Sequence, residues 1–182
     1  MKLGLVGSEM CIRDRFHDEE GICHVVLPEN GYLKPGMFAV GGDSHSPTGG
    51  AFGCYMFGIG ATEMAGVLAT GEIWIRVPET IRIEWEGTFQ EGVMAKDVML
   101  FLCGRLGMDG GRYQAVEYCG EAVSELSMQE RMTLSNMSAE LGAQAGLIAP
   151  DATTMKWLDD HGSENDQIAV SYTHLTLPTK ST

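Results

Sequence analysis

The sequence predicts an α/β fold in which strands and helices alternate along the chain. Short apolar or alternating runs, typical of strands, recur between longer segments whose apolar residues have helical spacing. Glycine and proline turns separate these segments. A polar string directly follows the first predicted strand, and α/β proteins place ligands at the carboxyl edge of a parallel sheet. Together these observations favour layers of helices and strands with a site at a strand end.

The first third of the chain predicts one strand and one helix. Residues 21–27 form a short apolar segment that is expected to enter the core. The turn at 34–36 precedes residues 37–42, which are predicted to form a short buried strand. Residues 51–70 are apolar on nearly every side and rich in small side chains, so they predict a packed, buried helix.

The next segments continue the alternation after a seam at residues 71–78. Residues 81–86 alternate apolar with charged side chains, which predicts a half-buried strand. Residues 95–106 have helical apolar spacing, and Gly107 ends the predicted helix. Residues 113–118 predict a further strand.

A capping box marks the start of the last predicted helix. Ser127 and Glu130 have the spacing at which each side chain satisfies the other residue's backbone N–H. The helix is predicted to run from 128 to about 145. On such a helix Asn136 and Glu140 share a face, being four residues apart. From the pattern alone, a solvated polar stripe is the favoured interpretation.

The composition excludes some classes of protein. The 182 residues carry 12 Lys and Arg against 25 Asp and Glu, a net charge of −13, which disfavours a nucleic-acid partner. The apolar run 51–70 contains Glu63 and lacks basic flanks, so a transmembrane helix is rejected. The cysteines show no C-x-x-C and no even framework, which indicates a reduced, cytoplasmic protein. They stand at positions 11, 23, 54, 103 and 119.

The candidate chemistry lies at residues 41–53, where Asp43, Ser44 and His45 stand together among glycines. These side chains donate, accept and transfer protons, and glycines let the backbone approach a ligand. A helix cap followed by a permissive turn explains the same residues about equally well. His24 lies in an apolar run, where a histidine is usually a satisfied core residue.

Three strings resemble the aconitase superfamily in type and order. They are GICHVV at 21–26, GDSHSPTGGAFG at 42–53 and NMSAELGA at 136–143. The similarity is greatest to large subunits of 3-isopropylmalate dehydratases and to homoaconitase-like proteins. It extends from about residue 16 to about residue 158.

The resemblance implies three-layer aconitase-type α/β domains. Residues 16–75 would be the C-terminal part of one domain, and residues 79–158 most of the next. Residues 1–15 and 171–182 resemble translated sequencing-adapter read-through and are set aside. The chain is therefore expected to be a fragment, inactive alone, of a longer enzyme.

The resemblance also implies a reaction, the dehydration and rehydration of a hydroxy-di- or tricarboxylate. The catalytic residues would be His24 paired with Asp43, and His45 paired with Glu140. Ser44 and Asn136 would bind substrate, while Thr48 is given no role. The family's [4Fe–4S] cluster is expected to use cysteines beyond this sequence, so no metal ligand is assigned here. A small subunit that carries a swivelling domain is the expected partner. No association with a membrane is expected.

The substrate and the reaction class leave alternatives. 3-Isopropylmalate, an intermediate of leucine biosynthesis, is favoured, and homoaconitate, citrate and methyl- or dimethylmalate stay open. A serine hydrolase using Ser44 is a second class, disfavoured because adjacent serine and histidine side chains are expected to diverge and no G-x-S-x-G is present. A cluster-free binding module is the third.

Overall fold

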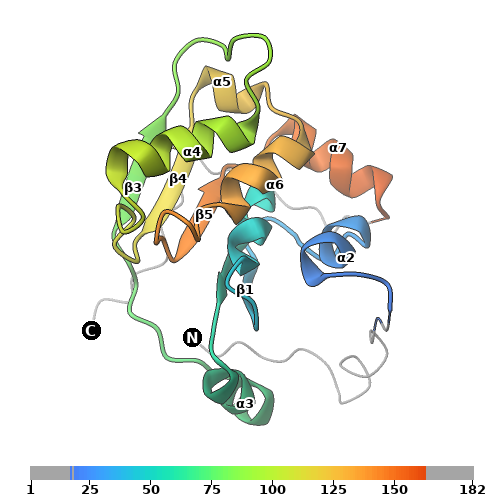
Figure 1. Cartoon of the computed structure of the whole chain (residues 1–182). Coiled ribbons are helices and arrows are strands. Elements are labelled where there is room, and N and C mark those ends of the chain that lie inside the picture. The colour runs from blue at the N-terminus through green and yellow to red at the C-terminus, as the bar shows by residue number, and fades with distance from the viewer. Residues whose placement is uncertain (1–16, 18, 163–182) are drawn as a thin grey trace, which may run out of the picture.

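The computed structural model describes residues 17 and 19–162, and it confirms the α/β class. The predictions made for residues 1–15, for residues 171–182 and for Cys11 lie outside this part of the chain. The described elements form two parallel sheets and their helices, which Figure 1 shows in chain order by colour. In this part of the chain no helix has the length and apolarity needed to cross a membrane.

The smaller sheet pairs β1 (Phe38–Gly41) with β2 (Tyr55–Gly58) in parallel, with Phe38 opposite Tyr55. A 3-10 helix, η1 (Ser46–Phe52), connects the two strands. All seven residues of η1 are buried, because this short helix passes through the middle of the molecule and packs on α6 and β5. Before β1, helix α2 (Cys23–Glu29) lies beside η1.

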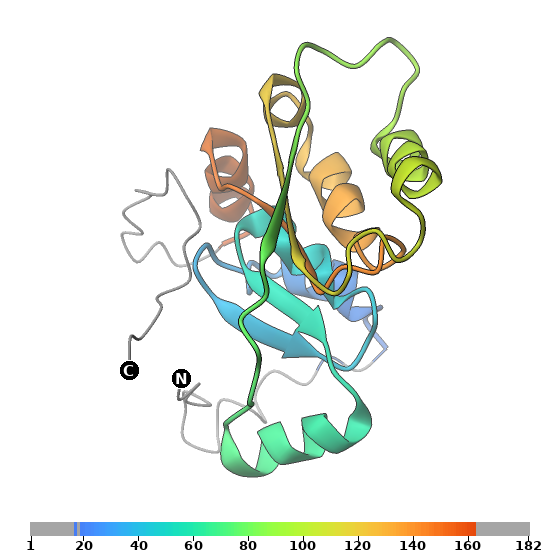
Figure 2. The same ribbon diagram turned by 90° about the vertical axis from the view of Figure 1, so that its left-hand side faces the viewer.

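The larger sheet has the order β3-β4-β5, and all its strands are parallel. Its strands are β3 (Thr80–Glu84), β4 (Ala115–Cys119) and β5 (Ala145–Ile148). The helices that follow β3 and β4 are α4 (Ala95–Leu106), α5 (Glu121–Ser124) and α6 (Met128–Asn136), and α7 (Ala152–Asp160) follows β5. Figure 2 shows α4 and α6 on one side of the strands and α7 on the other, which gives three layers.

The two sheets meet where η1 passes β5. A Cβ atom added to Gly50 would lie 1.7 Å from the carbonyl oxygen of Gly146, so only a glycine fits at this crossing. Apolar side chains of both sheets form one cluster beside it, including Tyr55, Phe57 and Leu147. This contact fixes the end of β1 relative to the end of α6, the two places that carry the polar motifs.

Replacing Gly50 by alanine is expected to destabilise the chain by about 1–3 kcal/mol or more, because backbone must move to admit the methyl group. Gly66 is the matched control: it lies within α3 (Ala61–Thr70), and an added Cβ there meets nothing within 4 Å. Gly66→Ala should therefore be neutral or stabilising by about 0.5–1 kcal/mol. Urea denaturation measures both, and equal midpoints for the two variants would contradict the close crossing.

The predicted buried helix at 51–70 is wrong in two respects. Residues 55–58 form strand β2, because Gly53 adopts a left-handed conformation (φ 70°) that ends η1, and the apolar run after it is a buried strand. The helix that does form, α3, lies wholly within the described part of the chain, and none of its residues is buried. Both Figure 1 and Figure 2 show it standing apart from the other elements.

Two further elements differ from the prediction. Residues 23–29 form helix α2 rather than an extended entry into the core. The helix predicted from 128 to about 145 ends at Asn136, and β5 follows. Gly142 has a φ of 74°, and a Cβ on Gly146 would lie 1.9 Å from Ser138 Oγ, so this stretch turns sharply instead.

Other predictions are confirmed. The helix at 95–106 has the predicted bounds and is capped by Gly107, and strands occupy most of 81–86 and 113–118. The capping box is present, since the Ser127 backbone N–H donates to Glu130 Oε2 over 3.0 Å. These features depend on residues close together in sequence.

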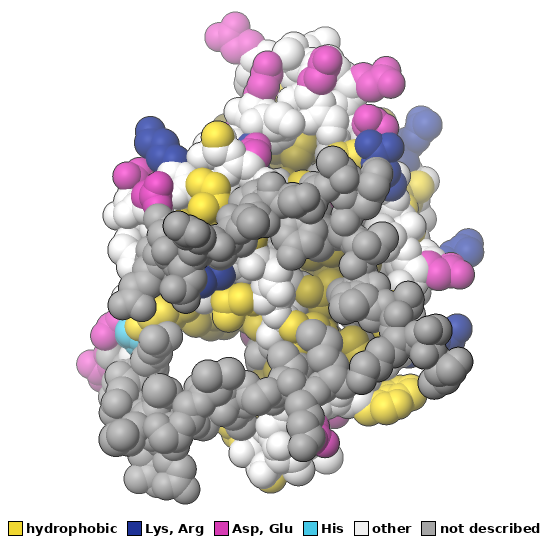
Figure 3. Space-filling model, turned by 180° about the vertical axis from the view of Figure 1, so that it is seen from behind, with side chains coloured by type: hydrophobic (Ala, Val, Ile, Leu, Met, Phe, Trp, Pro, Cys, Tyr) yellow, Lys and Arg dark blue, Asp and Glu magenta, His cyan; other side chains and the backbone are white. Residues whose placement is uncertain are grey.

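One end of the molecule is strongly acidic. Figure 3 shows acidic side chains without Lys or Arg at the tip formed by α5 and the loop before α4. The sequence there supplies Glu86, Glu91, Glu121 and Glu125. Because a polyanion needs clustered positive charge, this face opposes nucleic-acid binding.

Candidate acid–base site

The loop after β1 is held rigid by its own hydrogen bonds. The His45 backbone N–H donates to Asp43 Oδ1 over 2.7 Å, and Ser46 Oγ donates to the Asp43 carbonyl over 2.7 Å. The end of β2 presses on the same loop, since a Cβ on Gly58 would lie 2.5 Å from the Asp43 carbonyl oxygen. Asp43 and its neighbours are therefore fixed at the carboxyl end of β1.

Helix α2 carries His24 to this loop. Its Nε2 lies 2.8 Å from Asp43 Oδ1, although the two residues are 19 positions apart. The imidazole is 14% exposed and the carboxylate 51%, so the pair stands at the edge of a cleft. The pairing predicted from the resemblance is thus present in the structure.

His45 makes the second pair. Its Nε2 lies 2.9 Å from Glu140 Oε1, which bridges 95 positions of sequence. Glu140 lies four residues past the end of α6, on the turn that leads to β5. Its second oxygen, Oε2, is buried without a hydrogen-bond partner among the described residues, which leaves one acceptor for a ligand or a water.

The two imidazoles lie close to each other. Their ring centroids are 6.3 Å apart and the planes cross at 71°. Each ring has a carboxylate on one nitrogen, which orients the ring and fixes its tautomer. Two oriented proton carriers at this separation suit a reaction that removes one proton and supplies another.

Ser44 differs from the sequence-based expectation. Its Oγ lies 3.2 Å from His45 Nδ1, so the adjacent side chains converge instead of diverging. Because His45 Nε2 meets Glu140, the three residues form a continuous serine–histidine–glutamate chain of contacts. This geometry gives the hydrolase alternative a specific observation.

Asn136 and Thr48 connect α6 to the loop. Asn136 Nδ2 donates to Thr48 Oγ1 over 2.9 Å, and Thr48 Oγ1 donates to the His45 carbonyl over 2.7 Å. Thr48, which had been given no role, therefore links the predicted substrate-binding residue to the catalytic loop. In the sequence, the only indication that Thr48 belongs to this site is its position within the string at residues 42–53.

A cleft of about 450 Å³ opens beside the pairs, with His24, Asn136 and Glu140 in its wall. Lys96, on the first turn of α4, is the single Lys or Arg side chain in that wall. Sequence reasoning missed Lys96, because α4 reaches the cleft only through packing against α6. A cation here suits a carboxylate substrate.

The electrostatics favour an ionised Asp43. Hydrogen bonds from the His45 backbone N–H and from the His24 side chain lower the pKa of the Asp43 carboxyl below its ordinary value of 3.8. A depressed carboxyl pKa stabilises the fold above the ordinary value, and this contribution is lost as the pH falls through the folded-state pKa. The loop should thus loosen only under acidic conditions.

We expect the Asp43 carboxyl carbon to titrate in NMR with a midpoint below 3.8. In His24→Gln the midpoint should rise but stay below 3.8, because the larger cause, the His45 backbone N–H, remains. The conservative control is His161→Gln, which removes a ring that stacks on Trp157 away from the loop. A midpoint at or above 3.8 in the unmodified chain would overturn the assignment.

The described residues do not fit an iron–sulfur cluster. They include no group of three or more His, Cys, Asp or Glu side chains able to hold a metal ion. Burial raises the pKa of the Cys54 thiol to about 12, and Cys23 is exposed on α2. A cluster needs several converging thiolates, which this part of the chain lacks.

Comparisons with known proteins show which family this chain resembles. The family model described as Aconitase family (aconitate hydratase) matches residues 9–177. The chain is 51% identical over 146 residues to 3-isopropylmalate dehydratase large subunit 1 of Methanopyrus kandleri, covering 80% of this chain and 35% of that protein. It is 50% identical over 150 residues to the probable methanogen homoaconitase large subunit of Methanosarcina mazei, covering 82% and 38%.

A bacterial relative shows the same pattern. The 3-isopropylmalate dehydratase large subunit of Aquifex aeolicus is 43% identical over 143 residues, covering 79% of this chain and 33% of that protein. The chain thus spans about a third of the length of the curated relatives it matches.

Proposed function

The chain belongs to the aconitase family, and on that premise we propose that it supplies part of the acid–base centre of a hydro-lyase acting on a hydroxy-carboxylate. The observation that carries the proposal is the pair of imidazole–carboxylate contacts, 2.8 Å and 2.9 Å long, on two rings 6.3 Å apart. Dehydration takes a proton from carbon and gives one to the departing hydroxyl, so it needs oriented proton carriers.

In this proposal each residue has a distinct task. Asp43 and Glu140 orient the rings of His24 and His45 by contacting Nε2 of each, so both rings carry the transferred proton at Nδ1. Ser44 and Asn136 bind the substrate, with Thr48 holding Asn136 in place over 2.9 Å. Lys96, which lines the same cleft as His24 and Asn136, offers a positive charge to a substrate carboxylate.

The family's [4Fe–4S] cluster would act as a Lewis acid on the substrate hydroxyl. The described residues do not fit it, so no step is assigned to it here. We propose that its cysteine ligands belong to a part of the parent protein outside this sequence. The names of the relatives, which are large subunits, support a small subunit as the partner.

The substrate proposed is 3-isopropylmalate, with homoaconitate as the alternative. Relatives named for a 3-isopropylmalate dehydratase and for a homoaconitase are almost equally similar, at 51% and 50% identity. We also propose that residues 16–75 and 79–158 belong to two separate domains, and that the parent protein is cytoplasmic.

A chimera tests the activity. Residues 16–158 would replace the matching segment of the Methanopyrus kandleri relative, which would be purified anaerobically with a small subunit and its cluster. The proposal predicts turnover of 3-isopropylmalate within about tenfold of the unaltered relative, and slower turnover of homocitrate and citrate. A chimera that folds and holds its cluster but turns over none of the three contradicts the proposal.

The serine–histidine–glutamate contacts support a serine hydrolase as the second candidate. Under this alternative the Ser44 hydroxyl would attack an ester carbonyl while His45 accepts its proton. A fluorophosphonate probe applied to the 182-residue chain separates the two. Labelling that disappears in Ser44→Ala favours the hydrolase, and absence of labelling favours the hydro-lyase.

A further inference from the structure

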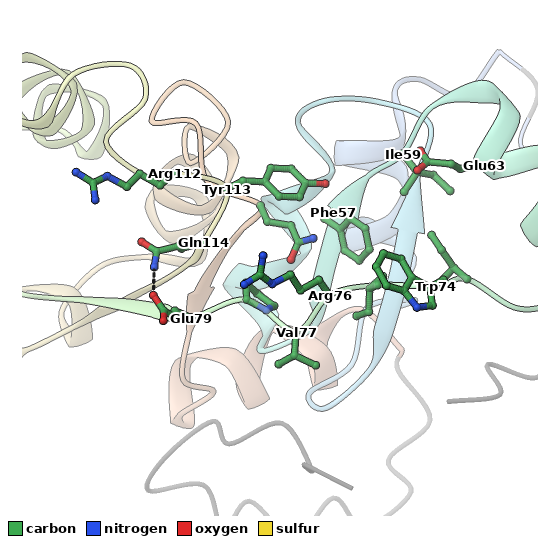
Figure 4. A pocket seen from close by; sticks show the side chains of 14 residues that line it. Phe57, Ile59, Glu63, Trp74, Arg76, Val77, Glu79, Arg112, Tyr113 and Gln114 are labelled. Atoms are coloured by element: carbon green, nitrogen blue, oxygen red, sulfur yellow. Dashed lines mark hydrogen bonds between the residues drawn. The ribbon is translucent and has the colours of Figure 1, made fainter. Parts of the chain in front are cut away.

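A further cavity lies outside the acid–base pairs. It has a volume of about 600 Å³ and is bounded by the end of β2, the extended segment 72–79, the loop before β4 and Gln144. Figure 4 shows Phe57 and Trp74 on one side, and Gln114 with Glu79 on the other. None of these side chains belongs to the two imidazole–carboxylate pairs.

The extended segment presents two unlike side chains to this space. Ile73 and Ile75 pack against the apolar cluster of the small sheet, so the alternate residues Trp74 and Arg76 lie on the other side of the segment. Trp74 is 87% exposed, which is unusual for so large an apolar surface. An indole and a guanidinium thus stand two residues apart on one edge of the cavity.

Arg76 has no charged or aromatic partner in the described part of the chain, unlike the arginines there that lie outside this cavity. Arg82 pairs with Glu84, Arg131 pairs with Asp151, and Arg105 stacks over Phe101. Among the described residues, the Arg76 side chain takes part in no hydrogen bond or ion pair. In a chain of net charge −13, with 25 acidic residues, an unpaired guanidinium at a cavity is conspicuous.

Neither of the two nearby carboxylates pairs with Arg76, and the other arginine of the lining does not add its charge to the cavity. Glu63 Oε2 accepts from the Gly60 backbone N–H over 2.9 Å, and Glu79 Oε2 accepts from Gln114 Nε2 over 2.8 Å. Figure 4 shows the Arg76 guanidinium within the ring of lining residues, whereas that of Arg112 points away from it. The positive charge available to a ligand is therefore that of Arg76.

The lining decides the ligand class. Eight of the 14 lining residues are apolar or aromatic, and among these Trp74, Val77 and Tyr113 are exposed. A multiply charged anion such as phosphate would have one free guanidinium to bind and would be repelled by Glu63 and Glu79. A monoanion with an apolar body would match both the single positive charge and the apolar side chains of the lining.

We propose that this cavity binds a small carboxylate with an apolar body, with its carboxylate on Arg76 and its body against the exposed Trp74 and Val77. The cavity shares Ile59, Tyr113 and Gln144 with a smaller one that is lined by Asp43 and Ser44. The site thus lies next to the acid–base centre, but its argument does not depend on the reaction proposed there.

The test is an NMR titration of the ¹⁵N-labelled 182-residue chain with 4-methylpentanoate. The Trp74 indole N–H, assigned by its loss in Trp74→Phe, should shift saturably. Arg76→Gln should weaken binding roughly tenfold or more, because a charged hydrogen bond is lost. Arg82→Gln is the matched control, since it removes the same charge outside the cavity and should leave the dissociation constant unchanged.

Two further ligands test which part of the molecule is recognised, and the rings of His24 and His45 report binding at the acid–base centre instead. Acetate, which lacks the apolar body, and 4-methylpentanamide, which lacks the charge, should each bind much more weakly. Shifts that grow linearly without saturation, equal binding of the amide, or equal binding by Arg76→Gln would overturn the proposal. Shifts confined to the ring protons of His24 and His45 would overturn it too, because they would place the ligand at the acid–base centre.

Discussion

Replacing His45 by asparagine in the chimera is expected to lower kcat by roughly 10²–10⁴-fold, the usual contribution of a positioned acid or base. The His45 ring contacts two groups, and its backbone contacts a third. Its Nε2 meets Glu140, its Nδ1 meets Ser44, and its backbone N–H binds Asp43. Only the first two contacts are lost in the variant, so the loop itself should keep its shape.

Steady-state kinetics with 3-isopropylmalate measure this effect, and two variants accompany it. His161→Asn is the matched control, because His161 stacks on Trp157 away from the cleft and should leave kcat unchanged. Glu140→Gln keeps the shape of the side chain but removes its charge, so its loss should be smaller and its pH profile displaced. A loss of less than threefold for His45→Asn would contradict the assigned role.

Replacing Arg131 by alanine is expected to cost about 3–5 kcal/mol in the free energy of unfolding, typical of breaking a buried ion pair. The Arg131 side chain is 0% exposed and binds both oxygens of Asp151, over 2.7 Å and 2.8 Å. It also donates to the carbonyls of Leu126 and Ser124, which would be left unsatisfied. The arginine therefore ties α6 to the start of α7.

Urea denaturation of the chain tests this prediction, with Arg82→Ala as the control. Arg82 is exposed and pairs with Glu84 over 3.0 Å, so its loss should cost less than about 1 kcal/mol. Should Arg131→Ala not fold, Asp151→Asn offers a milder change, because its backbone contacts with Thr153 and Thr154 can persist. Equal urea midpoints for the Arg131 and Arg82 variants would refute the role of the buried pair.

The candidate site was only partly predictable. The proton-handling residues 43–45 stand together in the sequence, so their chemistry was visible directly. The pairing of His45 with Glu140 rested on resemblance alone. The prediction that Asn136 and Glu140 share a helix face was wrong, since α6 ends at Asn136 and Glu140 lies on the turn after it. Thr48 and Lys96 carried no local signal, because neighbours from other elements give them their place.

The sequence by itself determined the α/β class, the helix at 95–106 and the capping box at 127–130, because these depend on residues a few positions apart. Only the tertiary structure decided that 55–58 is a strand, that α6 stops at Asn136, and that Gly50 crosses Gly146. Gly53 and Gly142 permit the first two changes locally, and pairing of β2 with β1 and of β5 with β4 completes them, because burial against a partner contributes more free energy than intrinsic propensity.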